Sequence, residues 1–477
     1  MSQTPCNILF IHTDQQRRDL IGCYGDRNIA TPNLDALAAE GVVFDNCFTP
    51  IPLCAPARAS MLTGLLPIHH GLVRNVESGS VDGLDFLGKF PAFSEILSAG
   101  GYSCWHAGKW HVGTQLRAED CGFRGVHYPG YGYPKKHPHY KDYLKSRGLP
   151  PFKLDREFHG THRDGSQGSL LAALQVGPLE AAPEYYLTEQ AIGMLREAAA
   201  AKQPFFGRID FWGPHEPCII PEPYYSLYDG LRLEPWPNFK EDFAGKPRIQ
   251  RDYVDYWSVQ DFAWEDWMKV IRAYYGYATM LDHQIGRLLA ALKALGLYEQ
   301  TAIFFTSDHG GMLGAHRLCD KGPFLYDEVL RVPFIARVPG VTRLGGREAG
   351  WIYNYDLMPT FLELAGMTAP AELDARSILP VLRGEQQREE LMFGEFHGHH
   401  VPVSLRVVRT GDWKYIFNGA DVDELYDLKH DPSEMVNRAS DPQCLATLRE
   451  MRERLRKRME EVNDPVLRYF EKARVRS

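Results

Sequence analysis

The sequence lacks an excess of basic residues. Its 53 lysines and arginines are outnumbered by 61 aspartates and glutamates, which gives a formal net charge of -8 at pH 7. A general nucleic-acid-binding protein needs surplus positive charge to neutralise phosphates. We therefore expect no nucleic-acid partner.

Long apolar runs are also missing. No stretch approaches the ~20 apolar residues that a membrane-spanning helix needs, so we expect no membrane partner. The opening stretch MSQTPCNILFIH has no basic segment ahead of a long apolar one, and NILFIH is too short for a signal-peptide core. We expect a cytoplasmic protein whose first strand is NILFIH.

A cysteine framework is absent as well. The nine cysteines are odd in number, and their positions, 6, 23, 47, 54, 104, 121, 218, 319 and 444, form no CxxC pair and no zinc-finger spacing. This pattern argues against a fold held together by disulfides. We expect most of the thiols to be free, which agrees with a cytoplasmic location.

The chain does contain a regular alternation of short apolar runs and helical patterns up to about residue 370. The predicted strands are 7–12, 102–107, 205–211, 301–306 and 332–336, and the predicted helices are 31–40, 184–200, 269–295 and 355–365. Such alternation predicts an α/β domain, with a mostly parallel central sheet and helices on both faces. We assign this domain to residues 1–370.

The pattern changes after about residue 375. Short strands at 405–408, 414–418 and 424–427 are separated by turns, and a charged helix follows at 442–461. We expect a smaller C-terminal α+β subdomain, residues 371–477, with a short antiparallel sheet. Two long regions, 113–182 and 214–266, lack clear periodicity, and we expect functional loops there.

The stretch PLCAPARASMLTG at 52–64 places a cysteine close to a proline and an arginine. Pro56 suits the first turn of a helix, and Gly64 is a helix stop. Cys54 therefore lies at or just before a helix N-terminus, where backbone N–H groups and the helix dipole favour negative charge. With Arg58 nearby, this setting suits a reactive thiol. The alternative is a small residue packed at a turn.

Polar side chains follow four of the predicted strands. The carboxyl ends of parallel strands share one edge of a sheet, where ligands bind, so these residues are expected to gather at one rim. They are Asp14 and Gln15, Lys109 and His111, His215, and Asp308 and His309. Each of them alone could have a structural role, but their shared location indicates a functional site.

The chemistry of this rim points to a pocket for a tetrahedral oxyanion. Three oxygen donors and one imidazole suit a hard divalent cation, and these are Asp14, Gln15, Asp308 and His309. The cations that join them are Arg58, Lys109 and Lys321. Two histidines, His111 and His215, are available for proton transfer. Cys54 is the candidate nucleophile.

With these motifs the chain resembles the sulfatase family, within the alkaline-phosphatase-like superfamily. The C-x-P-x-R sequence at 54–58, followed by MLTG, is a specific match. Further matches are TDQ at 13–15, TPNLD at 31–35, GKWH at 108–111, PHEP at 214–217, SDHG at 307–310, His316 and Lys321 at the family's spacing, and LYDL and DPSE at 425–428 and 431–434. The resemblance covers most of the chain.

The resemblance implies a modified nucleophile and a bound metal. A formylglycine-generating enzyme would read Pro56 and Arg58 and oxidise Cys54 to formylglycine (3-oxoalanine). The implied metal ligands are Asp14, Gln15, position 54, Asp308 and His309. Calcium is the family's commonest metal, with Mn²⁺ and Mg²⁺ as alternatives. The metal would lower the pKa of one hydroxyl of the hydrated aldehyde, which would attack sulfur.

The resemblance also implies a role for each remaining site residue. The residues that hold the sulfate oxygens would be Arg58, Lys109 and Lys321, and His316 would contact the substrate. His215 would help the ester oxygen to depart. His111 would take a proton from the second hydroxyl, which expels sulfate and regenerates the aldehyde. A plain cysteine lacks this release step.

Three positions depart from the commoner family pattern. Many members have two aspartates where this chain has Asp14 and Gln15, an asparagine at the position of His309, and a serine at the position of Ala57. An imidazole ligand favours manganese or another transition ion more than is usual in the family.

Two other functions stay open. A phosphonate monoester or phosphodiester hydrolase of the same superfamily can share formylglycine and an Asp-Gln pair, although GKWH favours sulfate because those hydrolases tend to lack this lysine and histidine. A catalytically silent oxyanion- or glycan-binding protein with unmodified Cys54 is the third reading. The expected substrate is a small-molecule or glycan sulfate ester. The aromatic stretch YPGYGY at 128–133 could stack on a sugar or aryl ring or be structural, and homo-oligomerisation is left open.

Overall fold

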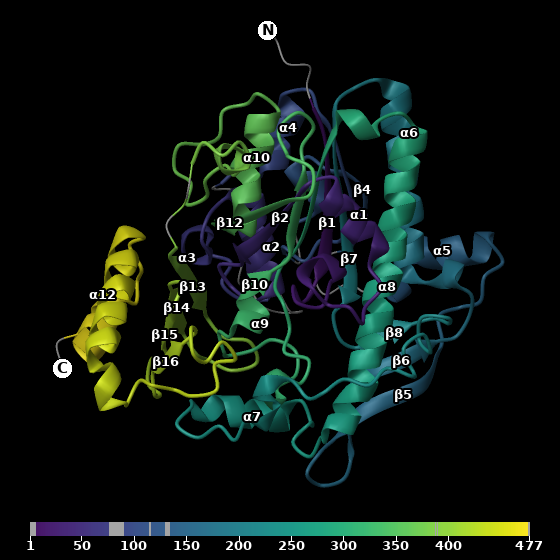
Figure 1. Cartoon of the computed structure of the whole chain (residues 1–477). Helices are drawn as coiled ribbons and strands as arrows, with labels where there is room; N and C mark the ends of the chain where they lie inside the picture. Colours follow the sequence, from purple (N-terminus) through teal and green to yellow (C-terminus); the bar gives the residue numbers. More distant parts are fainter. Residues whose placement is uncertain are drawn as a thin grey trace.

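The computed structural model describes residues 6–75, 90–113, 116–128, 134–386, 388 and 390–475. Its centre is a large twisted sheet (Figure 1). The strands lie in the order β10 (Arg331–Val332), β2 (Val42–Phe48), β11 (Phe334–Arg337), β9 (Thr301–Ser307), β1 (Asn7–Asp14), β7 (Phe205–Pro214), β3 (Ser103–Lys109) and β4 (Arg124–Tyr128), with β12 (Gly346–Tyr353) beside β2. From β9 to β4 all neighbours are parallel.

Helices cover both faces of this sheet (Figure 1). On one face lie α1 (Pro32–Ala39), α6 (Pro183–Ala201) and α8 (Trp264–Ala294), and on the other lie α2 (Cys54–Thr63), α4 (Phe93–Ala99) and α10 (Leu357–Leu364). Alternate residues of β1 serve the two layers, because Leu9 and Ile11 pack with the first set and Ile8 and Phe10 with the second. The predicted fold class, a mostly parallel sheet with helices on both faces, is confirmed.

One predicted strand differs in the structure. The single strand expected at 332–336 is two strands, β10 and β11, and both pair antiparallel with β2. Pro333 lies between them, and a proline has no N–H to donate to a ladder. The sequence analysis also missed β2, β4 and β12, which lie toward the two edges of the sheet.

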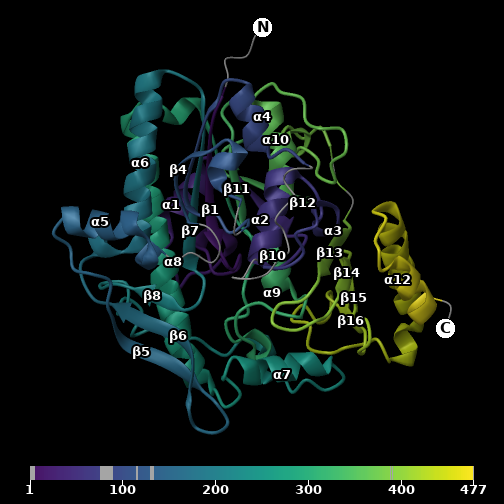
Figure 2. The same cartoon turned by 180° about the vertical axis from the view of Figure 1, so that it is seen from behind.

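The two regions expected to be loops contain regular structure. They include α5 (Pro138–Ser146), β5 (Leu154–Thr161), β6 (Gln167–Gln175), β8 (Cys218–Ile220) and α7 (Arg248–Tyr256). The strands form a separate sheet in the order β5-β6-β8, which projects beside the lower half of α8 (Figure 2). Residues 129–133 of the aromatic stretch at 128–133 lie outside the described residues.

The C-terminal part has the expected antiparallel sheet. Its strands are β13 (Met392–Phe396), β14 (Leu405–Arg409), β15 (Trp413–Phe417) and β16 (Glu424–Asp427), each paired with the next. Helix α12 (Leu445–Glu461) lies along the outer side of this sheet (Figure 2). Its buried stripe of Leu448, Met451, Leu455 and Met459 has helical spacing. The stripe belongs to the same apolar cluster as α2, α4 and α10, and the domain boundary at residue 370 stays a prediction.

Four short helices complete the described α-helices: α3 (Pro67–His70), α9 (Asp327–Leu330), α11 (Leu379–Leu382) and α13 (Leu467–Phe470). Within the described ranges, no helix combines the length and apolarity needed to cross a bilayer. All nine cysteines fall in these ranges and are free thiols, as predicted.

Candidate active site

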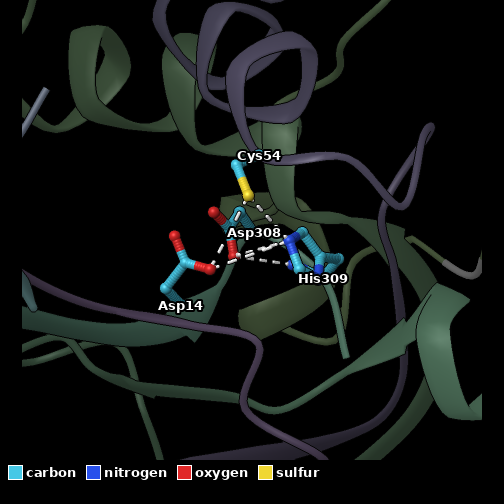
Figure 3. Close-up of side chains that lie close together, drawn as sticks. All are labelled: Asp14, Cys54, Asp308 and His309. Atoms are coloured by element: carbon cyan, nitrogen blue, oxygen red, sulfur yellow. Dashed lines mark hydrogen bonds and ion pairs between the residues drawn. The ribbon is translucent and has the colours of Figure 1, made fainter. Parts of the chain in front are cut away.

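The carboxyl ends of β1 and β9 meet the start of α2 at one buried point. Strand β1 ends at Asp14, and Asp308 and His309 follow β9 directly. Cys54 is the first residue of α2, after an extended Leu53, so its predicted place at a helix N-terminus is confirmed. One ligand atom from each of these four residues lies within 4.8 Å of the others (Figure 3).

His309 points its Nε2 into this cluster. The Nδ1 atom lies 2.7 Å from the Gly310 carbonyl oxygen and donates to it, which leaves Nε2 to face the Cys54 sulfur at 3.1 Å. The same Nε2 is 3.7 Å from Asp14 Oδ1 and 3.8 Å from Asp308 Oδ1 (Figure 3). Burial lowers the pKa of His309, but Asp308 and Cys54 outweigh burial and raise it to about 9.

Gln15 lies beside the cluster and is oriented by a carboxylate. Its Nε2 donates to Glu216 Oε2 over 2.7 Å, and its backbone N–H donates to Asp308 Oδ1. The amide oxygen Oε1 is buried and has no hydrogen-bond partner among the described residues. Gly311 permits this packing, because a Cβ there would lie 2.7 Å from Gln15 Cγ. Two carboxylates, an amide oxygen and an imidazole form a donor set that fits a divalent cation.

Arg58 lies one turn into α2 and binds three carboxylates. Its Nη2 donates to Asp14 Oδ2 at 2.9 Å, its Nη1 to Asp210 Oδ1 at 2.8 Å, and its Nε to Asp308 Oδ2 at 3.0 Å. A further Nη1 bond goes to the Lys109 carbonyl oxygen at 2.9 Å. All of these side chains are fully buried. The guanidinium therefore holds the two proposed aspartate ligands in fixed positions.

Lys109 closes the group from β3. Its ammonium lies 2.6 Å from Asp14 Oδ2. Burial alone would raise the pKa of Asp14, but the charges of Lys109 and Arg58 lower it well below its usual value. The segment after β3 is not extended at His111, where φ is 49°. Burial and the charges of Lys109 and Arg58 nevertheless lower the pKa of His111, so both side chains share this environment.

His215 and Lys321 form a contacting pair beside Asp14. The Lys321 ammonium contacts His215 Nε2 and lies 3.1 Å from Asp320 Oδ1. His215 Nδ1 donates to the Glu216 carbonyl oxygen, and its Nε2 is 3.9 Å from Asp14 Oδ1. Burial, followed by the charge of Lys321, lowers the pKa of His215, so the imidazole is neutral near pH 7.

The structure places His316 in a different buried group. Its Nδ1 lies 2.7 Å from Glu241 Oε2 and 3.3 Å from Lys246 Nζ, and its ring stacks on Tyr326 at 3.9 Å. The described contacts of His316 do not include Asp14, Cys54, Asp308 or His309. Its predicted role in substrate binding stays a prediction.

The sequence analysis missed three polar residues that support the site. Asp210 on β7 binds Arg58, Glu216 orients Gln15, and Asn75 Oδ1 accepts a hydrogen bond of 3.0 Å from the backbone N–H of Ala55, the residue after Cys54. A pattern in the sequence could have identified Asp210. Arg208 and Asp210 are charged residues two apart in an apolar strand, a spacing that puts both side chains on one face.

Comparisons with known proteins identify the family of the chain. The sulfatase family profile matches residues 6–367, and a profile described as "N-sulphoglucosamine sulphohydrolase, C-terminal" matches residues 314–461. An arylsulfatase of Clostridium perfringens is 31% identical, over 90% of this chain and 89% of its own length. The uncharacterized sulfatase YidJ of Escherichia coli is 30% identical, over 97% and 89%.

A solved structure of a phosphonate monoester hydrolase from Silicibacter pomeroyi superimposes with a TM-score of 0.79 at 26% identity, covering 97% of this chain and 96% of that chain. The fold is therefore shared with enzymes that act on another class of ester. The family profile covers most of the residues, and sulfatases match over nearly the full length. The chain belongs to the sulfatase family, the sulfuric ester hydrolases of the alkaline-phosphatase-like superfamily.

Proposed function

We propose that this enzyme hydrolyses a small-molecule or glycan sulfate ester, with Cys54 converted to formylglycine and a divalent metal bound beside it. The observation that carries the proposal is the buried cluster of Asp14, Cys54, Asp308 and His309, with ligand atoms within 4.8 Å of one another at the start of α2. Membership of the sulfatase family supports the same reaction.

The proposed metal ligands are Asp14, Gln15, position 54, Asp308 and His309. Gln15 Oε1, which has no hydrogen-bond partner among the described residues, supports the assignment. A buried amide oxygen needs a hydrogen-bond donor or a cation as its partner. We propose Ca²⁺ as the ion, with Mn²⁺ favoured next by the imidazole ligand. Such an ion would supply Lewis acidity toward the nucleophile. The hydrated aldehyde would supply one hydroxyl to attack sulfur and a second to release the product.

Lys109 and Lys321 are the residues that we assign to the sulfate oxygens. Both ammonium groups are buried at the cluster, where preorganised charge stabilises developing negative charge most effectively. Arg58 has less to offer the substrate, because four of its five N–H groups already bind Asp14, Asp210, Asp308 and the Lys109 carbonyl. Its main action is to fix the ligands.

The His215–Lys321 pair is the proposed proton donor to the departing ester oxygen. His215 Nδ1 carries a hydrogen that it donates to Glu216, so its Nε2 and the Lys321 ammonium share one mobile proton. His111, kept neutral by burial and by Lys109, is the proposed base for the release step. Formylglycine-generating enzyme is the partner that maturation would require, and a mass spectrum of the Cys54 peptide tests this.

Phosphonate monoester hydrolysis is the second candidate. The superposition on a phosphonate monoester hydrolase favours it, as does the Asp14-Gln15 pair. The ammonium of Lys109, 2.6 Å from Asp14, favours sulfate, because phosphonate monoester hydrolases tend to lack this lysine.

The deciding experiment compares an aryl sulfate with the matching phosphonate monoester. We expect wild type to have the higher kcat/KM on sulfate. Lys109→Ala is expected to cost the sulfate reaction about 2–4 kcal/mol, the loss typical of one preorganised charge-stabilising donor. Lys269→Ala is the matched control, since Lys269 is 52% exposed on α8 and pairs with Asp266. A wild-type preference for the phosphonate, or unchanged sulfate hydrolysis by Lys109→Ala, would overturn the sulfatase assignment.

A further inference from the structure

Lys321 lies in an irregular loop, residues 316–326, between β9 and α9. Three residues of this loop have a positive φ although they are not glycine: His316 at 50°, Arg317 at 60° and Asp320 at 58°. This conformation costs energy for any residue with a Cβ. Such a backbone persists only where surrounding contacts hold it, so the contacts at the two ends of the loop fix where Lys321 lies.

A ring stack closes the loop at its two ends. The rings of His316 and Tyr326 have centroids 3.9 Å apart and an interplanar angle of 9°. Both side chains are fully buried, and closely packed rings in a protein core resist displacement. Lys321 is midway between the two residues in the sequence, so the stack fixes the span that the loop must cover on either side of it.

A buried carboxylate anchors the His316 end. Glu241 Oε2 accepts hydrogen bonds from His316 Nδ1 at 2.7 Å and from Lys246 Nζ at 2.5 Å. Burial alone would raise the pKa of Glu241, but the hydrogen bond from His316 and the charge of Lys246 lower it to about 2. The carboxylate is therefore ionised near pH 7 and accepts both bonds at once.

The C-terminal part of the chain anchors the other end. Glu434 is the last residue of the DPSE sequence at 431–434, and its carbonyl oxygen accepts from Lys246 Nζ at 2.8 Å. Its Oε2 accepts the backbone N–H of Asp327 at 2.8 Å, and Asp327 follows the loop directly as the first residue of α9. Its Oε1 lies 2.8 Å from Lys414 Nζ on β15. Glu434 therefore contacts the supports of both ends of the loop.

We propose that His316 is a positioning residue for Lys321. Through the ring stack and the bond to Glu241, it keeps the Lys321 ammonium in contact with His215. This inference rests on the proposed function, in which the proton shared by His215 and Lys321 passes to the ester oxygen as its bond to sulfur breaks. A proton transfer needs a short distance between donor and acceptor. A loop released at the His316 end would move the ammonium away and weaken this step.

The test measures how strongly the reaction depends on the leaving group. The readout is the ratio of kcat/KM for 4-nitrophenyl sulfate to kcat/KM for phenyl sulfate. Phenol is the weaker acid, so its departing oxygen needs the proton more. We expect His316→Ala to raise the ratio about tenfold or more, as part of the rate gain that a positioned acid supplies. Lys321→Ala is expected to raise it too, and the double variant is expected to raise it no further.

His316→Phe separates positioning from direct contact with the substrate. This variant keeps the ring stack but has no hydrogen bond to Glu241, so its ratio should lie between those of wild type and His316→Ala. If the ring nitrogens contact the substrate instead, His316→Phe is as impaired as His316→Ala, and this result would overturn the positioning role. An unchanged ratio in His316→Ala or Lys321→Ala, or a further rise in the double variant, would overturn it as well.

Leu455→Ala is the control for lost stability, because Leu455 is fully buried on α12 and belongs to a different apolar cluster from Tyr326. A rise of the ratio in this control equal to that in His316→Ala contradicts the proposal. Melting temperatures verify that each variant is folded, and if His316→Ala is not, Tyr326→Leu removes the same stack and should raise the ratio equally. If wild type prefers phosphonate monoesters, the proposed function fails separately, and the matching 4-nitrophenyl and phenyl phosphonates then test the positioning role by the same ratio.

Discussion

Replacing Asp210 by asparagine tests the charge network beneath the active site. Asp210 is fully buried on β7. Its carboxylate accepts hydrogen bonds from Arg58 at 2.8 Å, Arg208 at 2.6 Å, His12 at 2.6 Å and His106 at 2.9 Å. Asp210→Asn keeps the shape but removes the charge and turns one acceptor oxygen into a donor that faces other donors.

The stability that Asp210→Asn should lose depends on which cation the substitution leaves without a carboxylate partner. Arg58 keeps Asp14 and Asp308 as partners, whereas Arg208 has no other carboxylate within ion-pair distance in the described part of the chain. Removing one partner of a buried pair typically costs about 3–5 kcal/mol, because the remaining charge stays buried without compensation. We expect Asp210→Asn to lower the free energy of unfolding by this amount.

The direction of the pH dependence is also fixed. Burial alone would raise the pKa of Asp210, but Arg208 leads the charges that lower it well below its usual value. A depressed folded-state pKa adds stability that is fully present above the ordinary pKa of about 4 and is lost as pH falls below it. The difference between wild type and Asp210→Asn should therefore shrink in acid.

Urea unfolding of a double-mutant cycle provides the assay. Arg208→Met removes the cation that Asp210→Asn strands, so the double variant should be at least about 1 kcal/mol more stable than the sum of the two single losses predicts. A loss below about 1 kcal/mol in Asp210→Asn, or strictly additive losses, would show that the network is not the source of the stabilisation.

Three further predictions concern the nucleophile, the metal and a surface histidine. Cys54→Ser should turn over once or very slowly, because a serine sulfate ester has no second hydroxyl to expel it, and a burst assay showing repeated turnover at the wild-type rate refutes the mechanism. Asp14→Ala and Asp308→Ala should lose metal and activity together, and full occupancy by elemental analysis removes that residue as a ligand. His69 binds Asp374 at 2.7 Å, and this hydrogen bond outweighs the lowering effect of burial and raises the pKa of His69 to about 8. Its stabilisation, about 1 kcal/mol or less after solvent screening, is present below pH 6.5 and lost as pH rises through 8. The melting temperature of wild type should therefore fall more over this range than that of His69→Gln, and parallel curves contradict the assignment.

The sequence predicted the centre of the fold better than its edges. Strands β1, β3, β7 and β9 are almost entirely buried because both faces of the sheet are covered, and apolar residues cluster in each of them. Their approximate ends and the polar residues that follow could therefore be predicted from the chain. Strand β12, GREAGWIY, is polar and half-exposed at the edge of the sheet, and its pairing with β2 joins residues about 300 positions apart. No local pattern encodes such a pairing.

The sequence analysis also did not identify the network of buried polar residues inside the sheet. His12, His106 and Arg208 lie in strands that read as apolar, and each was passed over as an isolated polar residue. Strand register brings them together, because His12 pairs with Asp210 and His106 with Arg208. Once the strand order is known, alternation predicts which of these side chains share a face. The order itself had to come from the structure.

Residue types alone could not show that Arg58, Lys109 and Lys321 have different roles. The sequence gives Arg58, Lys109 and Lys321 the same expected role, because all three carry a charge toward one pocket. In the structure they differ in how many of their N–H groups already bind protein. Four of the five N–H groups of Arg58 donate to protein oxygens, whereas each lysine is a single charge beside the cluster. A cation that is already bound to three carboxylates stabilises the arrangement before substrate arrives. Under the proposed function, we therefore expect the charge that discriminates between esters to come from the lysines, and Lys109 rather than Arg58 is the residue to change when sulfate is compared with phosphonate.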